Sequence, residues 1–165
     1  MGQIAQQRSF SRLGFEDESM VYSVYEEMTT LVPGEWSKAS SILAGLRAVK
    51  DQEELDRMRE AARITDRAFA HILDFIKPGM TERDVAVELA FFMQREGASG
   101  NSFDPIVASG PNGSRPHAVP GKREICQGDL ITLDFGCVYD GYCSDMTRTI
   151  GVGKLAEEQI SVYNI

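Results

Sequence analysis

The clearest pattern in the chain is an apolar stripe that follows Asp51. Apolar and small side chains recur there at alternating spacings of three and four residues, which is typical of one face of a long helix. The stripe comprises Leu55, Met58, Ala62, Thr65, Phe69, Ile72 and Ile76. Asp51 and Glu54 have the spacing of a capping box, and Lys77-Pro78-Gly79 would end the helix. The pattern predicts a helix over about 51–77 whose stripe faces a core.

A second, shorter helix is indicated directly after it. Thr81 is a suitable N-cap, and the apolar spacing continues until the helix ends near Gly97. The residues expected to face inward are Val85, Leu89, Phe92 and Met93. Both helices are expected to contribute mainly to core packing.

The character of the chain changes after Gly97. Phe103–Ala108 is a short apolar run. Residues 109–122 hold three glycines and three prolines, which is too many for a regular element. We expect a loop there, and His117 lies in it.

A hairpin is predicted further on. Two strand-like runs, Leu130–Tyr139 and Tyr142–Ile150, flank Asp140-Gly141. An Asp-Gly pair between such runs favours a tight turn, because both residues tolerate a positive φ. With a two-residue turn, Tyr139 faces Tyr142.

Counting outward from this turn places two carboxylates on one face of the hairpin. Asp134 lies opposite Thr147, so Asp145 is its diagonal neighbour, roughly 7–8 Å away at the backbone. The full set on this face is Thr132, Asp134, Gly136, Val138, Cys143, Asp145, Thr147 and Thr149. The opposite face is mainly apolar.

Two interpretations of the carboxylate face stay open from the pattern alone. Aspartate is disfavoured in strands, and two converging carboxylates suit a hard divalent cation. The alternative is an ordinary polar face of an antiparallel sheet in contact with water.

Composition adds limits on the class of protein. Apolar residues make up 42% of the 165 residues and charged residues 25%, which are values of a soluble globular protein. No run of ~18 apolar residues occurs, and the start of the chain lacks the apolar segment of a signal peptide. The net charge of −8 argues against nucleic acid as a partner. Three cysteines without a CxxC pair suit reduced thiols. We expect a cytoplasmic protein with no membrane partner.

Residues 1–47 do not form a recognisable unit. A strand near Leu13–Phe15 and a short helix from Ser19 through Met28 are expected, followed by a break at Pro33-Gly34.

Four sequence segments together carry a family resemblance. They are Ser102–Gly110, Pro116-His117, Gly128–Gly136 and Asp140–Thr149. This set resembles the first half of the catalytic domain of the creatinase/methionine aminopeptidase superfamily, and it is most similar to Xaa-Pro dipeptidases (prolidases) and Xaa-Pro aminopeptidases. The resemblance implies an α+β, pita-bread fold, in which helices cover a curved antiparallel sheet. It also implies that 1–47 is the end of an N-terminal domain and that 48–165 is the N-terminal half of the catalytic domain.

The resemblance implies a site as well. In the family, two aspartates, one histidine and two glutamates hold two divalent ions, often Mn²⁺, with Co²⁺ and Zn²⁺ as alternatives. Asp134 and Asp145 match the two aspartates, and His117 matches a catalytic histidine that holds substrate beside the metals. A metal-activated water would cleave a proline-containing peptide, and the full-length protein is expected to be a homodimer.

No residue matches the family's remaining three ligands, and none matches its general-base glutamate. We therefore expect an incomplete chain without activity of its own. We also expect the apolar face of the hairpin to be left partly uncovered. A non-catalytic binding module, creatinase and methionine aminopeptidase are the alternatives, and the two aspartates argue against the first two. The residues that would separate a dipeptidase from an aminopeptidase are not matched.

Overall fold

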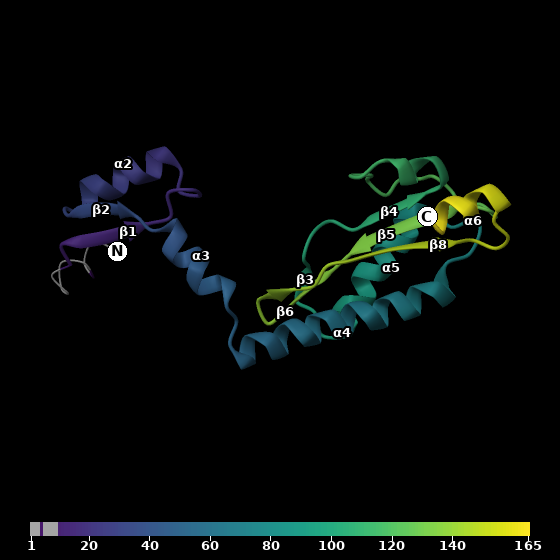
Figure 1. The fold of residues 1–165 in the computed structure, drawn as a ribbon, viewed down its shortest axis with the longest axis horizontal. Helices are drawn as coiled ribbons and strands as arrows, with labels where there is room; N and C mark the ends of the chain where they lie inside the picture. Colours follow the sequence, from purple (N-terminus) through teal and green to yellow (C-terminus); the bar gives the residue numbers. More distant parts are fainter. Residues whose placement is uncertain (1–3, 5–9) are drawn as a thin grey trace. The chain divides into compact units, whose positions relative to one another are not determined.

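The computed structural model describes residue 4 and residues 10–165, which form two compact units, 1–51 and 52–165. In the first unit, strands β1 (Arg12–Phe15) and β2 (Glu35–Lys38) pair in parallel (Figure 1). Helix α2 (Tyr22–Leu31) follows β1 in the chain, and helix α3 (Ser40–Ala48) follows β2. Three aromatic rings contact one another in this unit: Phe15, Tyr25 and Trp36.

The strand expected near Leu13–Phe15 is confirmed as β1, but the helix expected from Ser19 through Met28 is shifted. The amides of Ser19 and Met20 both donate to the carbonyl of Glu16, so this stretch forms a turn. Helix α2 begins only after Val21, which has extended backbone and no side-chain cap.

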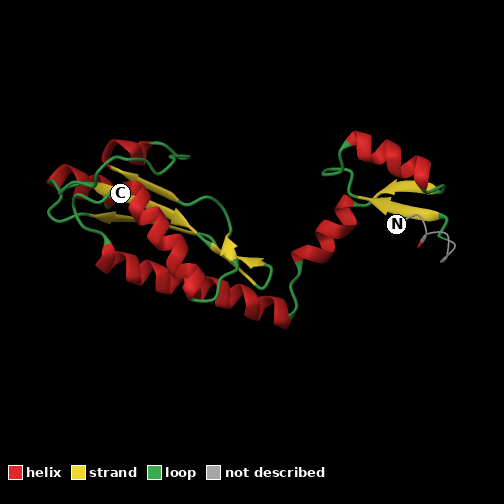
Figure 2. Ribbon diagram, turned by 180° about the vertical axis from the view of Figure 1, so that it is seen from behind, coloured by secondary structure: helices red, strands yellow, loops and turns green. Residues whose placement is uncertain are grey.

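The second unit combines two long helices with two small antiparallel sheets. The helices are α4 (Gln52–Phe75) and α5 (Glu82–Arg95). One sheet has the order β4 (Ile106–Ser109), β5 (Leu130–Phe135), β8 (Met146–Gly151), and the other β3 (Gly100–Asn101), β6 (Cys137–Tyr139), β7 (Tyr142–Cys143). A 3₁₀ helix, η1 (Gly110–Ser114), follows β4, and a short helix, α6 (Glu157–Tyr163), follows β8. Helices α4 and α5 pack against each other and against these strands (Figure 2).

Helix α4 confirms the long helix, with a correction to its buried face. Ile72 is fully buried, and Leu55, Met58, Phe69 and Ile76 are half-buried. Ala62 is exposed, whereas its buried neighbours are Ala61, Ile64, Thr65, Ala68 and Ile72. Small alanines occupy the middle of the buried face, and the larger residues of the expected stripe lie at its edges. The predicted stripe was therefore displaced by about one residue from the buried face of α4.

Helix α5 begins as expected. The hydroxyl of Thr81 accepts from the amide of Asp84, and the carboxylate of Asp84 accepts from the amide of Thr81. The buried side chains of this helix include Val85, Leu89 and Met93, whereas Phe92 is only half-buried. The helix ends at Arg95, and Gly97 then takes a φ of +106°.

The hairpin has the predicted turn and register. Asp140 and Gly141 have φ values of +46° and +84°, and Tyr139 pairs with Tyr142. The same register continues between β5 and β8, where Asp134 pairs with Thr147. The alternation along β5 is also confirmed, because every second residue is buried.

Each predicted hairpin strand is nevertheless broken into two. The breaks fall at Gly136 and at Ser144–Asp145. A Cβ at Gly136 would collide with the carbonyl oxygen of Ser144, and the hydroxyl of Ser144 accepts from the amide of Cys137 at 3.0 Å. This close approach bends the hairpin, so that one hairpin contributes to both sheets.

The apolar face of the hairpin is buried in part. Ile131, Leu133 and Phe135 of β5 are 0% exposed and lie in one core with residues of α4 and α5. Four other residues of this face are half-buried: Tyr139, Tyr142, Met146 and Ile150.

Candidate metal centre

Asp134 lies in the middle of β5 on the face turned away from the core. Its neighbours in the strand, Leu133 and Phe135, are fully buried, so the pleat directs Asp134 to the other side. The hydroxyl of Thr147, its partner across the strands, donates to Oδ1 of Asp134 at 2.8 Å. Asp134 is one of the residues that line the groove described below.

Asp145 lies in the break between β7 and β8, not inside a strand as predicted. The preceding residue, Ser144, is buried and is held by hydrogen bonds to Thr65 and to the amide of Cys137. Because successive residues alternate in direction, Asp145 is directed to the exposed side and is itself exposed.

Both aspartates line one open groove of about 730 Å³, so they do share a face of the hairpin. One wall is apolar and comes from Ala86, Val87 and Ala90 of α5. The segment from the end of β3 to the start of β4 and the loop after η1 supply the remaining walls. The residues from these two segments are Asn101, Phe103, Asp104, Pro105, Ile106, His117, Ala118, Val119 and Pro120.

His117 reaches this groove from the loop that was predicted for residues 109–122. Its side chain is exposed, and the next residue, Ala118, is buried. The structure therefore brings together all three residues predicted for the site, Asp134, Asp145 and His117.

Two groove residues were not predicted. Asp104 adds a third, exposed carboxylate, and the side-chain oxygen of Asn101 is buried without a hydrogen-bond partner among the described residues. Asp104 lies within the family-like segment Ser102–Gly110, whereas Asn101 lies directly before that segment and had no sequence signal of its own.

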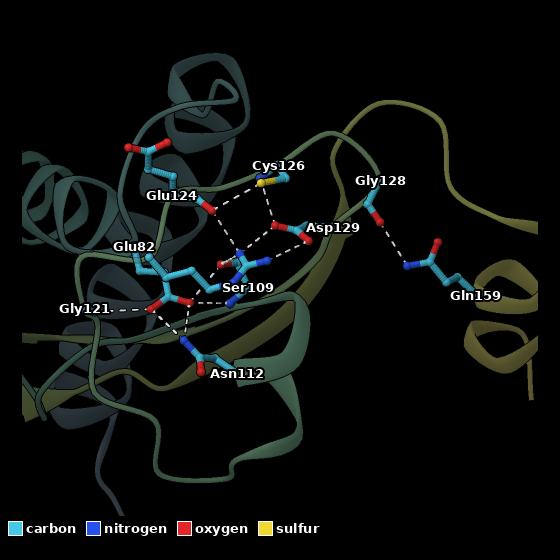
Figure 3. Close-up of polar contacts among 10 residues, drawn as sticks. Glu82, Ser109, Asn112, Gly121, Glu124, Cys126, Gly128, Asp129 and Gln159 are labelled. Carbon is cyan, nitrogen blue, oxygen red and sulfur yellow. Dashed lines mark hydrogen bonds and ion pairs between the residues drawn. The ribbon is translucent and has the colours of Figure 1, made fainter.

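The base of the His117 loop contains a buried carboxylate. Glu82, the first residue of α5, is 1% exposed and accepts hydrogen bonds from Ser109, Asn112 and Gly121 (Figure 3). Burial by itself would raise the pKa of the Glu82 carboxyl, but these hydrogen bonds outweigh it and leave the pKa below its ordinary value.

An ion pair lies beside this carboxylate. Nη1 of Arg123 lies 2.7 Å from Oδ2 of Asp129 and also donates to the hydroxyl of Ser109. The hydrogen bond from Arg123 lowers the pKa of Asp129, although partial burial opposes the shift. Sequence reasoning missed Glu82, Arg123 and Asp129, because their partners are distant in the chain or belong to the loop.

The donor set fits a hard divalent cation in part. Within the residues that the structure describes, Asp134 and Asp145 form no ion pair with lysine or arginine, so no side-chain cation neutralises the two carboxylates. Carboxylate oxygens are the ligands that Mg²⁺, Mn²⁺ and Ca²⁺ prefer. No group of three or more histidine, cysteine, aspartate or glutamate side chains is placed to hold a metal in the described part of the chain. The two aspartates thus offer part of a coordination shell.

His71 and the three cysteines do not line the groove. His71 lies 2.6 Å from Glu88 and stacks on Phe92, away from the groove. The three cysteines are free, with Cys137 buried and Cys126 and Cys143 exposed. Among the described residues, the longest helices lack the continuous apolar length needed to cross a membrane.

Comparison with known proteins places these features in context. Residues 56–165 match the sequence profile of Metallopeptidase family M24. The chain is 46% identical over 155 residues to the uncharacterized peptidase YqhT of Bacillus subtilis, covering 93% of this chain and 44% of that protein. It is 37% identical over 131 residues to a Xaa-Pro dipeptidase of Pyrococcus furiosus, covering 79% of this chain and 38% of that protein.

Solved structures give the same result. A Xaa-Pro dipeptidase from Bacillus anthracis superposes with a TM-score of 0.93 and 42% identity over 99% of this chain and 46% of that one. Prolidase from Pyrococcus furiosus superposes with a TM-score of 0.86 and 35% identity over 93% of this chain and 45% of that one. The expected fold class, α+β and one half of a pita-bread fold, is confirmed. The chain spans less than half the length of these relatives.

Proposed function

Because this chain belongs to metallopeptidase family M24, we propose that the protein carrying it is an exopeptidase that cleaves Xaa-Pro bonds. One observation carries the proposal: Asp134, Asp145 and His117, drawn from three separate segments, line one groove. The names of the relatives, Xaa-Pro dipeptidase and Putative Xaa-Pro aminopeptidase, support this substrate class. Because both names occur, a dipeptidase and an aminopeptidase are both open for this protein.

In this proposal, Asp134 and Asp145 are ligands of a pair of divalent ions, with Mn²⁺ preferred and Co²⁺ or Zn²⁺ as alternatives. When bound, such ions polarise a carbonyl and lower the pKa of a water molecule. The chain's own contribution is the placement of the two carboxylates. Strand β5 and the neighbouring Thr147 fix Asp134, and the bend at Ser144 directs Asp145 to the same side.

His117 would donate a hydrogen bond to the carbonyl of the bond being cleaved, and so hold it against the two aspartates. The wall formed by Val87, Phe103 and Pro105 would accept an apolar proline ring and keep water from it. A groove with one apolar wall and a group of carboxylates suits a peptide in which proline lies next to the end of the chain.

The remaining ligands and the general base would have to come from parts of the protein that these 165 residues do not supply. We include in the proposal that this chain alone has no peptidase activity. The cytoplasmic location, the homodimer and the absence of a nucleic-acid or membrane partner stay predictions.

A non-catalytic binding module is the main alternative, and methionine aminopeptidase is another. A binding module would be expected to lose the family's ligand residues, and the presence of Asp134 and Asp145 argues against it. The Ser144-Asp-Met-Thr-Arg-Thr149 segment favours the Xaa-Pro group over methionine aminopeptidase by its resemblance to that group.

The test uses the full-length protein. It is stripped of metal with a chelator, reloaded with Mn²⁺, Co²⁺ or Zn²⁺, and assayed on a Met-Pro dipeptide, a Met-Ala dipeptide and a longer Xaa-Pro peptide. We expect metal-dependent cleavage of the proline substrates only. Metal-dependent cleavage of Met-Ala at an equal rate would favour the methionine aminopeptidase alternative, and no cleavage of any substrate would favour the binding module.

A further inference from the structure

We propose that Glu82 is a positioning residue, whose buried carboxylate fixes the loop of residues 109–122 and thereby places His117 over the groove. The inference rests on the proposed function for the role of His117. The anchoring of the loop itself rests only on the contacts of Glu82.

Glu82 joins three separate points of the loop to helix α5. Oε1 accepts from the backbone amide and from the hydroxyl of Ser109, both at 2.8 Å. The side-chain amide of Asn112 lies 3.0 Å and 3.1 Å from the two carboxylate oxygens. Oε2 accepts from the amide of Gly121 at 3.3 Å. In Figure 3 the carboxylate points at all three residues.

An acidic residue at the start of a helix needs neither the burial nor the number of hydrogen bonds that Glu82 has. An exposed Glu in the first turn already interacts favourably with the helix dipole. Burying a carboxylate instead costs free energy unless hydrogen bonds replace its water. Here the loop supplies these hydrogen bonds, so the loop and the carboxylate stabilise each other.

A second contact reinforces the start of the loop. Arg123 donates to the hydroxyl of Ser109, which in turn donates to Glu82. Gly110 has a φ of +49°, and a Cβ there would meet the side chains of Arg123 and Asp129 at less than 3 Å. The backbone at the start of the loop therefore lies close to the Arg123–Asp129 ion pair.

His117 depends on these attachments because it lies between them. Asn112 precedes it by five residues and Gly121 follows it by four. Its own side chain is exposed, so its position is set by the backbone that carries it. Arg115 and Ala118 close a turn around His117, with the amide of Ala118 3.2 Å from the carbonyl of Arg115.

Glu82→Gln is the informative variant, because it keeps the size of the side chain. All the groups directed at the two oxygens of Glu82 are donors, so the amide nitrogen of glutamine would face a donor on one side. Glu88→Gln is the matched control. Glu88 lies on the same helix, is also hydrogen-bonded, and contacts His71 instead of the loop.

The first measurement is amide hydrogen exchange on the 165-residue chain. With Glu82→Gln we expect exchange of residues 109–122 to accelerate on the order of 10–100-fold, while α4 and β5 stay unchanged. Glu88→Gln should leave the loop unchanged. If loop exchange is the same as in wild type, or if α4 and β5 accelerate equally, the anchoring role is wrong.

The second measurement is the kinetics of the full-length, metal-loaded protein on a Met-Pro dipeptide. We expect Glu82→Gln to reduce kcat about 10-fold with unchanged metal content, and to add little when combined with His117→Ala. Additive losses in the double variant would overturn a role through His117. If the full-length protein shows no peptidase activity at all, the proposed function fails, and the hydrogen-exchange result still decides whether Glu82 anchors the loop.

Discussion

At the scale of single residues, Asp134 and Asp145 differ in how they are held. Asp134 lies inside a strand and accepts a hydrogen bond from the hydroxyl of Thr147, whereas Asp145 is exposed at the break between β7 and β8. The buried and hydrogen-bonded Ser144 directly before Asp145 helps to set its position. We therefore expect Asp145 to contribute to activity and hardly at all to the stability of the fold.

Asp145→Asn is expected to abolish most activity of the full-length protein while leaving its stability nearly unchanged. The amide keeps the shape but removes the negative charge of a ligand. Loss of a group that merely orients a ligand reduces affinity or activity about 10–100-fold, so loss of a ligand should reduce kcat/KM by at least about 100-fold.

The matched control is Asp140→Asn, an exposed aspartate in the turn of the same hairpin. Its ion pair with Arg57 lies at the surface, and asparagine tolerates its positive φ. Activity should stay near wild type in this control. Near-normal Mn²⁺-dependent cleavage by Asp145→Asn would contradict the assignment of Asp145 as a ligand.

Thr147→Val tests the support of Asp134. Valine has nearly the same shape as threonine but cannot donate to Oδ1 of Asp134. We expect Mn²⁺ affinity of the full-length protein, measured by calorimetry, to fall about 10–100-fold.

Thr149→Val on the same face serves as the control, because its hydroxyl lies beside Thr132 at 3.4 Å and does not contact Asp134. An equal loss of affinity in both variants would mean that the polarity of the face matters and not this hydrogen bond.

At the scale of elements, the sequence predicted what local chemistry decides. Thr81 formed the expected cap, to which Asp84 adds a second hydrogen bond, and Asp140-Gly141 formed the expected turn with its register. In each of these features the decisive residues are neighbours in the chain. The period of α4 was also correct, but its centre was missed because alanine gives a weak hydrophobic signal.

Features that depend on distant contacts were not predictable in the same way. The strand break at Gly136 follows from the carbonyl of Ser144, and the buried position of Glu82 follows from partners 27–39 residues away. From the sequence alone, Glu82 is an ordinary acid in the first turn of a helix. The grouping of Asp134, Asp145 and His117 was predicted only through the family resemblance and the hairpin count, and the groove that they line was not predicted.

Gly136→Ala should destabilise the second unit. The added Cβ would collide with the backbone oxygen of Ser144, which cannot move without opening the hairpin. Overpacking typically costs about 1–3 kcal/mol, so we expect a loss of at least that size in urea unfolding followed by circular dichroism.

Gly100→Ala is the control, because a Cβ there meets no atom within 4 Å. If the two variants unfold at the same urea concentration, the close approach at Gly136 is not what bends the hairpin.

At the scale of the whole molecule, the loop anchor predicts a response to acid. The pKa values of Glu82 and Asp129 both lie below their ordinary values in the folded state. Groups of this kind stabilise the fold fully above their unfolded pKa values of about 4.3 and 3.9, and they lose this contribution as the pH falls through the lower folded values.

The free energy of unfolding of the chain should therefore decrease as the pH falls below about 4. The decrease should be less steep in Glu82→Gln, which has no proton to bind at this position. The measurement is urea unfolding between pH 7 and pH 3. A slope that is the same in the variant and in wild type would exclude Glu82 as a source of acid sensitivity.

The last prediction concerns what the 165 residues do alone. Their second unit has a packed core, in which Ile131, Leu133 and Phe135 of the hairpin lie with residues of α4 and α5. The chain should therefore fold, and the absence of peptidase activity would not mean that it is unfolded.

Hard cations need about six oxygen ligands in octahedral sites, and Asp134 and Asp145 provide only part of that number. With no third metal-binding side chain gathered among the described residues, water would have to complete the shell. We expect circular dichroism of a folded protein, Mn²⁺ binding too weak to saturate at micromolar concentration, and no cleavage of a Met-Pro dipeptide. Binding of two ions per chain with turnover would show that a second copy of the chain or another segment completes the site, and would overturn the proposal that this chain alone is inactive.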